Sequence, residues 1–294
     1  MPASASTTIA MELRRRFIFR GNAAAFGGRI IRPKDIVLEA PGASALPVTG
    51  GRSVARIPRT AFEDFFSVES ASTFAEGRFD DAGQLIEKTH HRVQEDSLTA
   101  TTTVNADVVG MAIGRKPRVT VGHLHASLTA RSPLASGEPA IQIGKDTVIE
   151  KVAVNGHNLI IELDLTPFQR CDTHAKLMAA ADDHAFVRES GRALFMQTSQ
   201  HGHPAPGTGR LLESYPGTLY ATIVKSIKWA GEPFPGAHIE NNMVAIPDFG
   251  RLFFGELLIS RYDRRLTMVR GALGSDSGGD ASGGDVQDNG SWGV

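Results

Sequence analysis

The stretch TVIEKVAVNGHNLIIELDL, residues 147–165, carries the strongest signal for the fold of this chain. Asn155 and Gly156 lie between two runs rich in β-branched and apolar residues, and both tolerate the positive φ angles of a two-residue type I′ turn. A turn of this length pairs Val152 with Leu159 across two antiparallel strands. We therefore predict a β-hairpin with one apolar face. The apolar side chains on that face are Val152, Leu159, Ile161 and Leu163.

The same two-residue period of apolar and polar residues recurs along most of the chain, as in half-buried β-strands. In ELRRRFIFR the alternation is followed by Gly21-Asn22, which suits a turn. The segments predicted as strands are 12–20, 98–130 (two or three strands broken by GRKP at 114–117), 218–231, and a second hairpin formed by 251–260 and 264–273.

Signals for helices are few. Pro167 fits the first position of a helix, Thr166 can cap it, and Gln169 completes a capping box. We expect one substantial helix over about 167–190, although Asp172-Thr173 could start a separate helix, and a short helix near 61–66. The excess of strands over helices predicts a mainly β protein, a large antiparallel sandwich or barrel-like body.

The last 21 residues differ in composition from the rest. Residues 1–273 are interpreted as a single β-rich domain, whereas 274–294, GSDSGGDASGGDVQDNGSWGV, hold glycines and aspartates without lysine or arginine. Such a segment has little apolar area to offset the loss of conformational entropy on folding, so we predict a flexible acidic tail. Its aromatic residue, Trp292, is a candidate anchor for docking, and the alternative is a tail that only aids solubility.

The overall composition is that of a soluble globular protein, with 41% hydrophobic residues, 21% charged residues and a formal net charge of −1. This balance does not indicate a nucleic-acid partner, since such proteins carry basic patches. A single cysteine, Cys171, cannot form an intrachain disulfide and fits a reducing compartment. No apolar run approaches the about 18 residues that span a bilayer, and the amino terminus lacks a secretory signal pattern. We expect a cytoplasmic protein without a membrane partner.

Two histidine pairs could carry metal chemistry. In VTVGHLHASLTA, residues 119–130, His123 and His125 project from one face of a strand and could share a metal ion. The next glutamate, Glu138, is too distant along the chain to complete the usual ligand pattern. The face that carries both histidines becomes more polar along the strand, so we expect the two rings to face solvent or a partner subunit.

The second pair, His201 and His203, lies in the Gly/Pro-rich segment TSQHGHPAPGTGR, with Arg210 and Glu213 at its end. Loops of this kind are exposed and often carry binding residues, although an ordinary connection has the same composition. If both pairs met in space, four imidazole nitrogens would form a site for zinc, iron or manganese.

The leading hypothesis is a non-enzymatic structural or binding protein without a cofactor, because the chain contains many strands and no complete catalytic motif. It would act through self-assembly as a homo-oligomer or by docking to a partner protein, with Arg210, Glu213 and Trp292 as candidate binding residues. The alternative is a metal-dependent enzyme, a hydrolase or oxygenase, that uses the four histidines. A third possibility is a metal-free ligand pocket lined by Trp229 or Tyr220.

Overall fold

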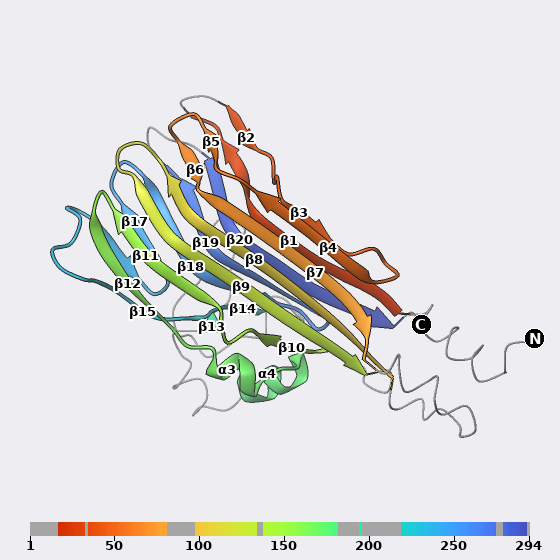
Figure 1. Cartoon of the computed structure of the whole chain (residues 1–294). Coiled ribbons are helices and arrows are strands. Elements are labelled where there is room, and N and C mark those ends of the chain that lie inside the picture. Colours follow the sequence, from red (N-terminus) through yellow and green to blue (C-terminus); the bar gives the residue numbers. More distant parts are fainter. Residues whose placement is uncertain are drawn as a thin grey trace, which may run out of the picture.

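Two antiparallel β-sheets pack face to face in the computed structural model of the chain (Figure 1). The structure describes residues 17–32, 35–80, 98–133, 138–181, 194–195, 219–274 and 279–292. Within these ranges strands predominate, so the predicted mainly β fold is confirmed, and the body is a sandwich of two open sheets. Buried apolar side chains between the sheets form one main cluster, to which both ends of the described chain contribute.

Sheet A contains ten strands in the described part of the chain. They are β1 (Phe17–Ile30), β2 (Ile36–Leu38), β3 (Ala43–Ala45), β13 (Leu194–Phe195), β14 (Leu219–Thr222), β16 (His238–Glu240), β17 (Met243–Ile246), β18 (Gly250–Ile259), β19 (Asp263–Leu273) and β20 (Gly279–Trp292). The main order is β13-β14-β18-β19-β20-β1-β2; β3 pairs with β1, β17 with β18 and β16 with β17.

Sheet B also contains ten strands within the described ranges. They are β4 (Gly51–Ile57), β5 (Thr60–Phe62), β6 (Phe66–Val68), β7 (Ser70–Phe79), β8 (Thr99–Ile113), β9 (Val119–Pro133), β10 (Ala140–Ile143), β11 (Val148–Val154), β12 (His157–Leu163) and β15 (Val224–Trp229). The order is β15-β12-β11-β9-β8; β8 then pairs with β6, which continues to β5, and with β7, which continues to β4, while β10 pairs with β9.

The hairpin predicted from the Asn155-Gly156 turn is confirmed. Strands β11 and β12 pair with Val152 opposite Leu159, and both side chains are buried in the core. The φ angles of Asn155 and Gly156 are 46° and 86°, the left-handed values that a type I′ turn requires. The hairpin of β18 with β19 and the two long strands β8 and β9 are confirmed as well.

Two predictions about strand continuity are wrong. The segment 218–231 is not one strand, because the chain leaves sheet A after β14 and enters sheet B as β15, with the fully buried Ile223 at the crossing. The turn at Gly21-Asn22 is absent, because β1 continues through it. A Cβ atom at Gly21 would lie 2.9 Å from side chains of β8, so this glycine permits the sheets to approach closely.

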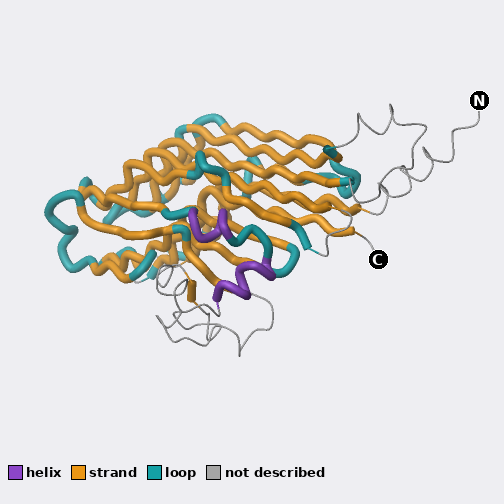
Figure 2. Tube along the Cα trace, turned by 90° about the horizontal axis from the view of Figure 1, so that it is seen from below, coloured by secondary structure: helices purple, strands orange, loops and turns teal. Residues whose placement is uncertain are grey.

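The helix predicted over 167–190 is interrupted. Its described part forms two helices that belong to neither sheet, α3 (Thr166–Arg170) and α4 (His174–Ala181) (Figure 2). Residues 182–190 are not among the described residues. At the break, the buried Arg264 of β19 donates hydrogen bonds to the carbonyl oxygens of Cys171 (2.7 Å) and Ile141 (2.7 Å). These tertiary hydrogen bonds use a carbonyl that a continuous helix would need.

The capping box is also wrong, because Thr166 lies inside α3 and its N–H is bound by the Asp164 carboxylate (3.0 Å). No helix in the described ranges is long and apolar enough to cross a membrane.

The short helix predicted near 61–66 is a β-hairpin of β5 and β6 instead. Glu63 adopts a φ of 52° in the turn, and Phe66 pairs with Ile113 of β8. The Phe66 ring packs against Phe26 of the opposite sheet, with 4.9 Å between ring centroids. Pairing and packing with distant strands therefore decide the structure of this segment.

Most of the predicted flexible tail is an inner strand. Residues 279–292 form β20, which lies between β19 and β1 in sheet A (Figure 1). Its Ala281 and Val286 are fully buried. The prediction of flexibility fails because hydrogen bonds to two neighbouring strands, rather than apolar side chains alone, hold this glycine-rich segment.

Candidate functional site

The alternation of inward and outward side chains reverses along one line across sheet B. On β8 the buried residues step from Val108 to Met111, and on β9 they step from Val121 to Leu124, three residues in place of the usual two. We call the line of residues at this reversal, Glu69, Gly110, Gly122 and Lys151, the seam of sheet B.

Backbone conformation produces the reversal. Gly110 and Lys151 have φ angles of 66° and 54°, in the left-handed region that turns a strand over by one residue. Pairing between β8 and β9 stops at the seam and resumes on its far side in the same register: Val109 pairs with His123, and Met111 with Val121. The seam therefore acts as a set of aligned bulge-like positions on neighbouring strands.

Sheet A has a corresponding seam at Ala25, Gly255, Met268 and Gly284, where the register pairs between strands are likewise interrupted. The two seams pack against each other through the core. A Cβ atom at Gly283, beside the seam of sheet A, would lie 2.7 Å from Sδ of Met111 in sheet B. Glycines in β20 thus make room for the residues that flank the seam of sheet B.

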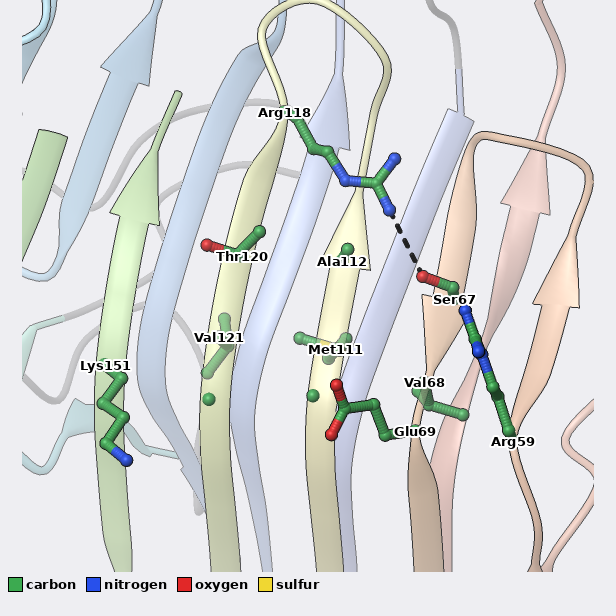
Figure 3. A pocket seen from close by; sticks show the side chains of 12 residues that line it. Arg59, Ser67, Val68, Glu69, Met111, Ala112, Arg118, Thr120, Val121 and Lys151 are labelled. Atoms are coloured by element: carbon green, nitrogen blue, oxygen red, sulfur yellow. Dashed lines mark hydrogen bonds between the residues drawn. The ribbon is translucent and has the colours of Figure 1, made fainter. Parts of the chain in front are cut away.

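On the outer face of sheet B the seam creates a hollow of about 330 Å³, here called the seam pocket (Figure 3). Gly110 and Gly122 lie side by side at its base without side chains, while Glu69, between β6 and β7, and Lys151 of β11 lie over them. The pocket is lined by Arg59, Ser67, Val68, Glu69, Gly110, Met111, Ala112, Arg118, Thr120, Val121, Gly122 and Lys151.

The charged groups of the seam pocket have few partners. The half-buried Arg118 donates hydrogen bonds to Oγ of Ser67 (3.4 Å) and to the carbonyl oxygen of Asp64 (3.4 Å), both near the upper limit for a hydrogen bond. Within the described part of the chain, the exposed side chains of Arg59, Glu69 and Lys151 make neither a hydrogen bond nor an ion pair. These groups are therefore available to a ligand.

The predicted histidine pair lies beside the seam pocket. His123 and His125 both face outward, and the Asp107 carboxylate lies between them: its Oδ2 is 3.0 Å from Nε2 of His123 and 3.1 Å from Nδ1 of His125. Two more carboxylates lie at the edge of this histidine cluster, Glu150 at 3.8 Å from His123 and Asp146 at 3.0 Å from His125.

The two rings face outward, as the alternation predicts, but their strand does not have one continuous polar face. Val119 and Val121 point into the core, because the reversal at Gly122 separates them from the histidines. No group of three or more His, Cys, Asp or Glu side chains is arranged to hold a metal ion in the ranges that the structure describes. The cluster instead holds each imidazole by a hydrogen bond to one carboxylate, in a partly exposed setting where such pairs are weak.

The structure does not place four of the remaining predicted site residues. His201, His203, Arg210 and Glu213 lie outside the described residues. Trp292 belongs to β20, where its backbone pairs with Phe17 of β1, so its expected position at the end of a free tail is wrong.

Of the two aromatic residues predicted to line a pocket, Trp229 is described by the structure, whereas the side chain of Tyr220 lies outside what it describes. Trp229 of β15 packs against the core and does not line the seam pocket. One sequence feature could have indicated the seam pocket. Gly110 and Gly122 lie inside strands, where a glycine often marks a bulge or a close contact, and the prediction of strands from alternating residues did not consider them.

No curated protein and no solved structure matches the chain. The model of one family, described as Domain of unknown function (DUF8256), matches residues 17–260, a range that contains the seam of sheet B and the histidine cluster. The chain belongs to this family.

Proposed function

We propose that this protein is a non-enzymatic binding protein that takes a small ligand in the seam pocket. The observation that carries the proposal is the set of charged side chains around two adjacent glycines, of which Arg59, Glu69 and Lys151 have no partner within the described residues. Polar groups that converge on a hollow are the usual means of orienting a small ligand.

Binding without catalysis is favoured by the residue types in the pocket. Its described lining contains arginines, a lysine, hydroxyl groups and one carboxylate, but neither histidine nor cysteine. Catalysis by a nucleophile requires a nucleophilic side chain and a base, commonly histidine, within hydrogen-bond distance of each other. Ser67 accepts a hydrogen bond from Arg118, and a guanidinium cannot remove its proton.

Self-assembly through strand edges, the other form of the proposal, has less support. Two of the edge strands of sheet B are β4 and β15, and β5 is a further edge within the described ranges. The exposed Arg52 and Arg56 lie on β4, and the exposed Lys225 and Lys228 lie on β15. Pairing of either edge with another copy of itself, or of β4 with β15, would bring like charges together, which is how natural sheets discourage edge-to-edge association.

A pair of tryptophan substitutions tests the proposal. Thr120→Trp places a bulky side chain in the seam pocket, whereas Ile160→Trp adds the same group at another exposed position of sheet B. Thermal unfolding is measured for wild type and both variants with a library of small metabolites. We expect metabolites that raise the melting temperature of wild type and Ile160→Trp but not of Thr120→Trp.

Two results would reject the proposal: equal stabilisation of all three proteins, or no stabilising compound for any of them. Light scattering coupled to size-exclusion chromatography tests self-assembly separately. If the wild type is an oligomer and Val54→Glu has the mass of one chain, the result would favour association through the β4 edge.

A further inference from the structure

Positive charge predominates around the seam pocket. Arg59, Arg118 and Lys151 line it, and Glu69 is the carboxylate among its lining residues. In sheet A, comparable arginines are held by carboxylates: Arg270 donates to Glu256 at 2.6 Å and 2.7 Å. The basic groups of the seam pocket lack such carboxylate partners within the described residues, so an anion from solution could take that place.

Arg118 is positioned to bind an anion without losing the fold. Figure 3 shows its side chain reaching from the start of β9 toward Ser67. Its guanidinium has five N–H donors, and the two hydrogen bonds that it makes are long. Its backbone is fixed independently, because Arg118 N donates to Oδ1 of Asn155 (2.8 Å) and its carbonyl accepts from Asn155 N (2.9 Å).

Glu69 determines where in the pocket an anion can lie. Its side chain lies over Gly110, where a Cβ atom on the glycine would be 2.4 Å from Glu69 Cγ. A carboxylate there repels an anion nearby, so the favourable position is toward Arg118 and Ser67. Glu69 is then free to accept a hydrogen bond from a donor or cationic group elsewhere on the same ligand.

We propose that the seam pocket binds its ligand through an anionic group, a phosphate or a carboxylate, held at the Arg118–Ser67 end, with a hydrogen-bond donor of the ligand directed to Glu69. This inference rests on the proposed function and adds the chemical class and orientation of the ligand. The planar guanidinium of Arg118 can donate two parallel hydrogen bonds to either type of anion.

The test uses inorganic phosphate and acetate as probes, titrated into the full-length protein at constant ionic strength and followed by calorimetry. Arg118→Ala is expected to weaken binding of the preferred anion by about tenfold or more, the usual effect of losing a charged hydrogen-bond donor. Glu69→Gln is expected to strengthen it, because the repulsive charge is removed. Arg56→Ala, which removes an exposed arginine of sheet B outside the pocket, is the matched control and is expected to bind as wild type does.

The phosphate and acetate arms distinguish the two sources of negative charge, since the anion with the lower Kd identifies the class. The proposal is overturned if neither probe binds, or if Arg118→Ala and Arg56→Ala change the affinity equally. Circular dichroism of each variant confirms that the fold is kept, and Arg118→Lys, which retains the charge without the planar fork, is expected to give an intermediate affinity. If metabolites stabilise wild type but not Thr120→Trp while neither anion binds, the binding function stands and the anionic class is rejected.

Discussion

Substitution of Val286 by alanine tests whether residues 279–292 belong to the folded body or to a tail. Val286 is fully buried, and it pairs with Ala23 on one side and Leu266 on the other. The substitution removes two carbon atoms from the core, each worth about 0.8 kcal/mol of transfer free energy, and it leaves a cavity. We expect the free energy of unfolding to fall by about 2–3 kcal/mol.

Urea unfolding followed by far-UV circular dichroism measures this loss, and Ser282→Ala is the control. Ser282 lies on the same strand and is half-buried, so its hydroxyl is expected to contribute about 0.5 kcal/mol or less. A variant that ends at residue 274 removes β20 entirely and separates β19 from β1. It is expected not to fold cooperatively.

A flexible tail would behave in the opposite way. Val286→Ala, Ser282→Ala and the chain that ends at residue 274 would then all unfold at the same urea concentration as wild type. That result would refute the placement of β20 inside sheet A. Unfolding of the truncated chain alone could reflect a general loss of solubility, which is why the point substitution carries the argument.

Three further predictions follow from buried or paired groups. Burial raises the pKa of Asp288 well above its ordinary value, so the folded state keeps this proton over a wider pH range than the unfolded state, and the free energy of unfolding falls as pH rises through the folded-state pKa. Asp288→Asn is expected to flatten that decline in urea unfolding measured at pH values upward from the ordinary carboxyl pKa of 3.8, and equal pH dependence in both proteins would contradict it. Burial lowers the pKa of Arg264 to about 10, so its side chain remains charged at neutral pH. Arg264→Met is expected to lower the free energy of unfolding by about 3 kcal/mol or more, because the carbonyl oxygens of Ile141 and Cys171 lose their donor. A change in the urea midpoint no larger than that of Ser282→Ala would argue against this. Dialysis against a chelator is expected to leave the melting temperature unchanged, because Nε2 of His123 and Nδ1 of His125 are already held by the Asp107 carboxylate without a metal ion. Stoichiometric zinc, iron or manganese in elemental analysis, lost together with stability, would show the reverse.

The sequence by itself determined the type of structure and its most local elements. Alternating apolar residues predict strands whatever their neighbours, and Asn155-Gly156 fixes a hairpin because two adjacent positive φ angles are available to few residue pairs. The outward direction of His123 and His125 follows from the same alternation.

Only the tertiary structure decided the features that depend on distant strands. β20 is ordered because β19 and β1 bind its backbone, which its polar composition does not reveal. The 61–66 segment forms a hairpin because Phe66 packs on Phe26, and the helix after Thr166 is broken where Arg264 binds its carbonyl groups. The seam pocket arises because Gly110 of β8, Gly122 of β9 and Lys151 of β11 are aligned across sheet B, and alignment is a property of strand register rather than of any one strand.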